Sequence, residues 1–308
     1  MSGVALAEPR PRRGKGRSPM KAGSLGLQMM IKSGRYRVAV DNASKQLDED
    51  PDNPELHAAQ GVAWSRLGYP ADALGAFQFS GGAAFYEDVG IEAHATALRE
   101  VGDGEAAVDL RSQRLVSSSL TDSREFRLWY NLIDDLRVAG RPEEALDSVA
   151  ASLSIYPNAP ATYAQLADCY YAMGFDEEGD AALWTSERLG GSQLTRILNI
   201  EHALANGDLM HADALSNNLR QFRVPDPRLL GLRVEVLRQM GDLDEAAALL
   251  ERSRYRLTEA AEVLIARARV YRDLNDTVRY TQAVHRLSTV YGDHPDVKGV
   301  LAEMPATP

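Results

Sequence analysis

The chain of 308 residues is short of cysteine and of long apolar runs. Cys169 is its single cysteine, which excludes an intramolecular disulfide framework. No apolar run reaches the roughly 18 residues that a membrane span needs. No charged segment is followed by an apolar stretch and a cleavage site, as a secretion signal requires. These absences predict an intracellular, cytoplasmic protein in which Cys169 is a small packing residue.

The residues of common catalytic and metal sites are also missing in usable arrangements. Cys169 has no histidine partner that the sequence identifies, and no glycine-rich loop is placed to hold a phosphate. No two histidines share one helical face at a spacing suited to a metal; they are His57, His94, His202, His211, His285 and His294. The sequence therefore predicts no enzyme, no cofactor and no metal.

Positive charge is scarce in the long middle of the chain. Residues 1–21 carry a net charge of +5, residues 22–219 of −16 and residues 220–308 of +1. Nucleic-acid binding depends on clustered cations, so the middle is a poor nucleic-acid surface. Residues 1–19 are rich in Pro, Gly and Arg and poor in large apolar residues, which predicts a disordered basic leader. Two interpretations of this leader stay open: a solvated segment without function, or a tether to nucleic acid or an acidic membrane.

What the sequence has in abundance is an internal repeat of about 34 residues, the period of a two-helix unit. A residue that tolerates the left-handed conformation after a helix end recurs at spacings of 34, 34, 38, 34, 33, 34 and 34. These turn markers are Gly34, Gly68, Gly102, Gly140, Gly174, Gly207, Gly241 and Asn275. A small residue follows five positions after seven of them, at Ala39, Ala73, Ala107, Ala145, Gly179, Ala212 and Ala246. Tyr280 takes this place in the last unit.

The fourth and fifth units have the most complete pattern. They read Trp129-x-x-Leu132-Ile133-x-x-Leu136-x-x-x-Gly140 and Tyr163-x-x-Leu166-Ala167-x-x-Tyr170-x-x-x-Gly174. This pattern resembles the tetratricopeptide repeat family. The resemblance implies an all-α, right-handed α-solenoid of about eight helix pairs over residues 20–294, with residues 295–308 as a capping helix and a frayed tail. The third unit departs from the pattern, because Arg111 stands where the family prefers an aromatic residue or leucine.

The single 38-residue spacing coincides with a polar tract, residues 117–123. We expect an enlarged loop there, either a hinge between two blocks or a surface insertion. The insertion is favoured, because the repeat resumes in phase after it.

The resemblance also implies a binding surface, a concave groove lined by the first helix of each pair. The groove residues that it implies are Tyr130, Asp134, Arg137, Asp168, Tyr171, Ile197, Glu201, Arg238, Arg269 and Arg272. Tyrosines flanked by paired charges are typical of recognition hot spots. We therefore expect a non-enzymatic scaffold or adaptor that holds a peptide or amphipathic helix of a partner protein, in a bacterial assembly or regulatory complex.

The acidic middle of the chain favours a basic partner segment. Two other functions stay open: a nucleic-acid or membrane tether that acts through residues 1–19, and a self-assembling structural subunit joined through its end repeats. Binding that is sensitive to salt and is lost on deletion of residues 1–19 would indicate the tether. A molecular size that depends on protein concentration would indicate the self-assembling subunit. The sequence leaves the partner, the pathway and the oligomeric state open.

Overall fold

The computed structural model describes residues 22–81, 87–116, 122–217, 226–253 and 259–304. Within these residues it has 17 helices and no strand. The helices are α1 (Ala22–Lys32), α2 (Tyr36–Leu47), α3 (Pro54–Leu67), α4 (Pro70–Phe79), α5 (Glu87–Val101), α6 (Gly104–Val116), α7 (Asp122–Val138), α8 (Pro142–Ile155), α9 (Pro160–Ala172), α10 (Asp176–Arg188), α11 (Gln193–Ala205), α12 (Leu209–Ser216), α13 (Pro227–Met240), α14 (Leu243–Arg252), α16 (Ala261–Asp273), α17 (Thr277–Tyr291) and α18 (Pro295–Glu303). The prediction of an all-α fold built from about eight helix pairs is confirmed.

Each pair turns at the residue that the sequence marks. All eight turn residues have positive φ, from +58° at Asn275, the one non-glycine among them, to +96° at Gly102. A residue with a β-carbon is strained in this conformation, which explains why glycine recurs there. The backbone N–H groups that follow bond back to the last carbonyl groups of the first helix, as between Asp242 and Leu237.

The small residue five positions after each turn lets the two helices of a pair pack closely. Six alanines and Gly179 hold this position in the first seven units, and all are buried. At Gly179 an added β-carbon would lie 2.4 Å from the ring of Tyr171, so the second helix can approach only because the side chain is absent. Tyr280 occupies the position in the last unit and is buried too.

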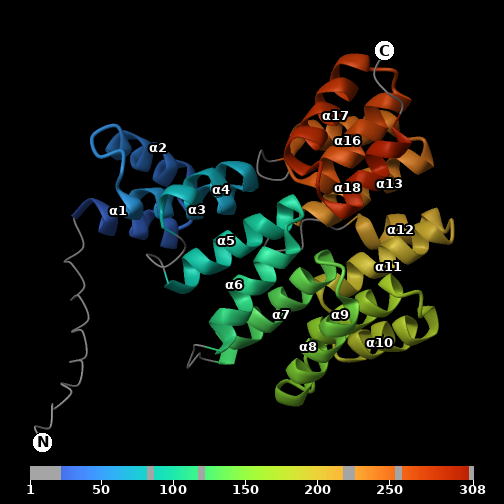
Figure 1. Ribbon diagram of the computed structural model, residues 1–308. Helices are drawn as coiled ribbons and strands as arrows, with labels where there is room; N and C mark the ends of the chain where they lie inside the picture. The colour runs from blue at the N-terminus through green and yellow to red at the C-terminus, as the bar shows by residue number, and fades with distance from the viewer. Residues whose placement is uncertain (1–21, 82–86, 117–121, 218–225, 254–258, 305–308) are drawn as a thin grey trace, which may run out of the picture.

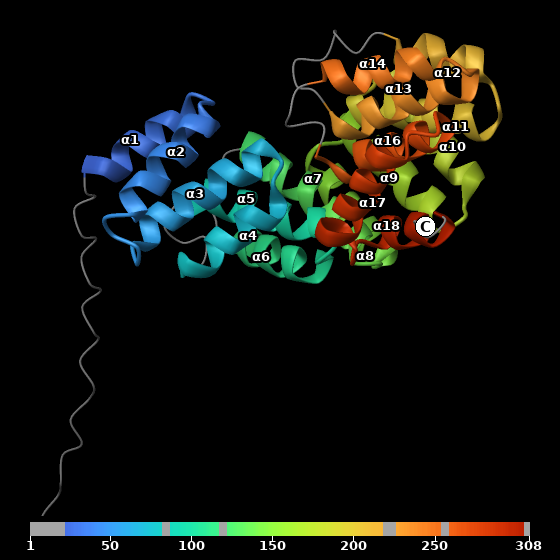
Figure 2. The same ribbon diagram turned by 90° about the horizontal axis from the view of Figure 1, so that it is seen from above.

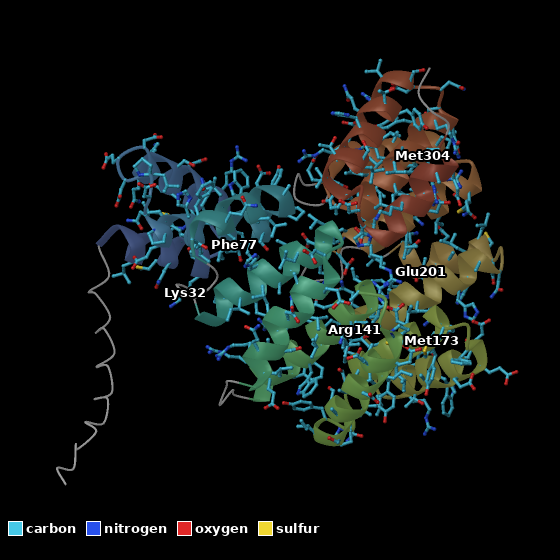
Figure 3. The ribbon with its side chains drawn as sticks, viewed as in Figure 1. Lys32, Phe77, Arg141, Met173, Glu201 and Met304 are labelled. Carbon is cyan, nitrogen blue, oxygen red and sulfur yellow. The ribbon has the colours of Figure 1, made fainter. Side chains whose placement is uncertain are left out.

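The hydrophobic core is a series of clusters that follows the chain. The first cluster spans α1 to α5 and contains Phe77, which Figure 3 labels on α4. Later clusters overlap on a shared helix: α9 joins two of them, α13 the next two, and α16 the last two. Each helix pair therefore buries its apolar side against its neighbours, as expected of a solenoid.

The array curves until its last pair returns to its third. The helices α5 and α17 are in contact, and Figures 1 and 2 show one end of α5 near the last helices, while α1 to α4 extend away from the later helices. At this junction a β-carbon added to Gly102 would lie 2.6 Å from Cα of His294. The closing contact between the turn at Gly102 and the segment 293–294 is thus a contact between backbones.

The ends of the array differ in what the structure describes. Near the C-terminus, α18 packs on α16 and α17, and Val297 is fully buried. The predicted basic leader, residues 1–19, and the predicted frayed tail from residue 305 lie outside the described residues. So do residues 117–121 of the predicted loop, but α7 already begins at Asp122, so the loop prediction of 117–123 is too long by two residues. No described helix combines the length and the apolar character that crossing a membrane requires.

Candidate functional site

The implied groove residues lie on α7, α9, α11, α13 and α16, the first helices of successive pairs. We use the term inner face for the side of the array on which polar residues of these helices and of α5 lie together. Charged residues on this face and buried beneath it form three clusters of ion pairs, each of which joins different helix pairs. The clusters are described in order along the chain.

The first cluster joins α5, α6 and α7. Arg99 Nη1 lies 3.4 Å from Asp135 Oδ1 and 3.5 Å from Asp134 Oδ2. Arg111 Nε lies 3.0 Å from Asp135 Oδ2, and the side chains of both residues are 0% exposed. Gln165 of α9 donates to Asp134 Oδ1 over 3.0 Å. The fully buried pair lies where the apolar cluster of α1 to α5 gives way to the next, so an ionic contact joins the two parts of the core.

The second cluster joins α7, α9, α11 and α13. Arg137 Nε lies 3.3 Å from Asp168 Oδ2. Arg228 donates two hydrogen bonds to Glu201, of 2.8 and 2.6 Å, and lies 3.7 Å from Asp168. Burial alone would lower the pKa of Arg228, but Glu201 and Asp168 raise it. Since Arg228 of α13 reaches past α11 to α9, the first helices converge on this side; Figure 3 labels Glu201 there.

The third cluster joins α13 and α16. Arg238 donates two hydrogen bonds to Glu235 and one, of 2.7 Å, to Asp273. Arg269 Nη1 lies 3.9 Å from Glu235, and Arg272 Nε lies 3.3 Å from Asp273. Burial would raise the pKa of the Asp273 carboxyl, but the hydrogen bonds from Arg238 and Arg272 lower it below its usual value. Arg269 and Arg272 are 32% and 43% exposed, so this cluster reaches solvent.

Comparison with known proteins gives structural likeness only. No family model matches the chain, and no curated protein matches it. Similar solved structures include a tetratricopeptide repeat protein from Parabacteroides merdae, with 14% identity, a TM-score of 0.47, and coverage of 92% of this chain and 98% of that one. The fold is that of a tetratricopeptide-repeat array. It rests on the paired helices and their turns, which this structure shows directly.

Two other solved structures resemble parts of the tetratricopeptide array. PilF of Pseudomonas aeruginosa has 18% identity and a TM-score of 0.43, over 70% of this chain and 96% of its own. A MamA structure has 22% identity and a TM-score of 0.47, over 55% of this chain and 94% of its own. Identities and TM-scores this low say nothing about a shared partner.

The array brings most of the implied groove residues together. Asp134, Arg137, Asp168, Glu201, Arg238, Arg269 and Arg272 all belong to the three clusters. Tyr130 lies beside the first cluster, where its carbonyl oxygen accepts a hydrogen bond of 2.7 Å from Gln165. Burial raises the pKa of the Tyr130 hydroxyl, so it is a neutral donor at physiological pH.

Two of the implied residues lie elsewhere. Ile197 is 3% exposed and packs in the core between α9 and α13, so the expectation that it faces a partner is wrong. Ile197 lies one turn before Glu201 on the same side of α11, but at its level the apolar cluster shared with α9 and α13 covers the helix. Tyr171 packs against Gly179 and donates a 2.7 Å hydrogen bond to Asp180 of α10. It belongs to the contact within its own helix pair.

Sequence reasoning missed five charged residues of the clusters: Arg99, Arg111, Asp135, Arg228 and Asp273. Arg111 did leave a signal, because it is the one charged residue at a repeat position that is apolar in all other units except the sixth, where Ser216 stands. A charge at a position predicted to be buried requires a buried counter-charge, and Asp135 supplies it. No comparable signal marks Arg228, whose partners come from two other units. Among the described residues, no group of three or more His, Cys, Asp or Glu side chains could hold a metal ion.

Proposed function

We propose that this tetratricopeptide array is a non-enzymatic scaffold that binds a segment of a partner protein on its inner face. The observation that supports the proposal most is the gathering of seven implied groove residues into three clusters of ion pairs on consecutive first helices. A protein segment laid along this face would meet side chains from several units at once. Ion pairs between half-buried side chains can be exchanged for pairs with a partner, which gives specificity through charge complementarity.

The charges of the inner face argue for a partner segment with both signs of charge. In the second cluster two arginines face two carboxylates, so the charges cancel. The third cluster has three arginines and two carboxylates. The negative charge of residues 22–219 is therefore not concentrated on this face, and we propose a mixed or amphipathic partner in place of a purely basic one. A cytoplasmic location stays a prediction.

The proposal is tested by co-purification from the native cell extract with matched charge variants. The inner-face variant combines Arg137→Ala, Arg269→Ala and Arg272→Ala, which all lie at partly exposed positions. The control variant combines Arg37→Ala, Arg188→Ala and Arg252→Ala, which lie outside the three clusters. Both remove three positive charges, and circular dichroism establishes that both are folded.

We expect a protein that is recovered with the unaltered chain and the control and is lost or strongly reduced with the inner-face variant. Identical partner lists for the two variants would refute binding on the inner face. Recovery that depends only on residues 1–19 would favour a tether through the leader.

A further inference from the structure

A pocket of about 340 Å³ lies away from the three clusters, between α14, α16 and α17. Its polar lining consists mainly of Arg267, Arg279 and Arg286, with Glu251 and Glu259 opposite them. Tyr271 completes the wall and donates its hydroxyl hydrogen to Glu251 over 2.8 Å. Three guanidinium groups and two carboxylates leave the pocket with an excess positive charge, in a chain whose net charge is −10.

Arg267 is the arginine that the surrounding protein leaves unpaired. Its Nε is buried and has no hydrogen-bond partner, and among the described residues its guanidinium forms no ion pair. A buried donor without a partner costs free energy, so an acceptor bound in the pocket would recover part of that cost. Arg267 is half-buried, and its guanidinium belongs to the pocket lining.

The repeat offers a comparison for Arg267, which stands eight residues before the turn residue Asn275. At three equivalent positions of earlier units a polar residue bonds to the second helix of the preceding pair: Gln60 donates to Ser44 over 3.0 Å, Asn199 donates to Glu187, and Arg233 pairs with Asp213. At a fourth, His94 stacks on Phe77 of the preceding pair, and its buried Nδ1 has no hydrogen-bond partner. Of the two arginines at this position, Arg233 has an acidic partner, whereas Arg267 lines the pocket and its buried Nε has no hydrogen-bond partner.

The other two arginines have partners of their own, at different distances. Arg286 donates a 2.9 Å hydrogen bond to Glu259. Arg279 lies 3.8 Å from Glu251, a looser contact, and its guanidinium covers the ring of Tyr271 at 5.2 Å. Arg279 Nε also lies 3.7 Å from Asp276, so Arg279 has two loose acidic contacts that a ligand would have to replace, whereas Arg286 is hydrogen-bonded to Glu259.

We propose that this pocket binds a phosphate group, with Arg267 as its principal ligand and Arg279 as the second. A guanidinium matches phosphate oxygens through two parallel hydrogen bonds. Phosphate carries up to two negative charges, so it competes with Glu251 and Glu259 better than a singly charged carboxylate does. The volume exceeds that of inorganic phosphate and lies in the range of small-molecule sites, so the phosphate monoester of a small molecule also fits.

Calorimetric titration of the full-length protein at low ionic strength, with inorganic phosphate, glycerol 3-phosphate and acetate, tests this proposal. We expect saturable binding of the two phosphates and at least tenfold weaker binding of acetate. Equal affinities for both phosphates identify a site for free phosphate, whereas tighter binding of the monoester identifies a small phosphorylated molecule. Either result supports the site. Absence of saturable binding of both, up to about 10 mM, overturns it.

Three variants locate the binding. Arg267→Gln is expected to weaken phosphate binding about tenfold or more, the effect of losing one charge-assisted contact. Arg252→Gln on α14 removes the same charge outside the pocket and should leave the affinity within about twofold, as expected of an exposed pair. Glu259→Gln removes a competing carboxylate and should tighten binding, an effect that loss of folding cannot imitate. Unchanged affinity in both Arg267→Gln and Glu259→Gln would refute the assignment.

Discussion

Substitution of Gly102 by alanine tests the contact that closes the array. A β-carbon at Gly102 would lie 2.6 Å from Cα of His294 and 2.9 Å from its backbone nitrogen. Backbone atoms cannot move aside as a flexible side chain can. Either the segment 293–294 shifts as a whole, or the contact between the third and the last pair opens.

Gly140 is the matched control for this substitution. It is also a turn residue, with φ of +72° against +96° at Gly102, and no atom lies within 4 Å of the β-carbon that alanine would add. Both alanine variants incur the cost of a left-handed conformation, about 1–2 kcal/mol. Only Gly102→Ala also incurs the clash, for which about 1–3 kcal/mol is typical of overpacking. The difference between the two free energies of unfolding isolates the closing contact.

Urea unfolding followed by circular dichroism measures that difference, and amide hydrogen exchange locates it. We expect Gly102→Ala to be less stable than Gly140→Ala by about 1–3 kcal/mol, with faster exchange at the end of α17 and at the junction with α5. In Gly140→Ala the faster exchange should stay within α7 and α8. Equal stability of the two variants, with unchanged exchange near residues 291–294, would show that the array does not close on itself.

Three further predictions concern buried side chains and the packing of helices. Arg111→Leu should lower the free energy of unfolding by about 3–5 kcal/mol, because it leaves Asp135 buried with one guanidinium partner fewer. In urea unfolding, the double variant with Asp135→Leu should recover most of that loss. An equal loss in the double variant would contradict the ionic explanation. Burial raises the pKa of the Cys169 thiol to about 12. A thiol reagent at pH 8 should therefore label Cys169 only as fast as the protein opens. Labelling at the rate of a free thiol would show that Cys169 is exposed. Gly75→Ala in α4 should stabilise the protein by about 0.5–1 kcal/mol, since nothing lies within 4 Å of the added carbon. Gly179→Ala should destabilise the protein, because the added carbon displaces Tyr171. A shift of both urea midpoints in the same direction would refute this reasoning.

The sequence predicted features that repeat locally. A turn residue with positive φ and a buried small residue five positions later depend on contacts within about 20 residues, so each leaves a regular mark in the chain. The eight turn markers and the seven small residues lie in the structure where those marks are. The α18 helix follows the same logic, because Val297 and its apolar neighbours recur at helical spacing.

The candidate site could be predicted only in part. The resemblance placed Asp134, Asp168 and Glu201 on the correct side of their helices, because an inner-face position has a fixed offset from the turn. The resemblance did not identify the arginines with which these three carboxylates form ion pairs. Arg99 and Arg228 reach them from other units, at distances in the chain that vary from pair to pair. Ile197 was misplaced because the offset does not record where apolar side chains of α9 and α13 cover α11.

The sequence by itself therefore determined the all-α class, the number of helix pairs and the position of each turn. Only the tertiary structure decided that the last pair returns to Gly102, that Arg111 and Asp135 share a buried site, and that the buried Nε of Arg267 has no hydrogen-bond partner. The physical reason is the range of the interactions. Helix periodicity and turn conformation are set by neighbours in the chain, whereas curvature adds small rotations over many units and brings together side chains whose separation in sequence follows no period.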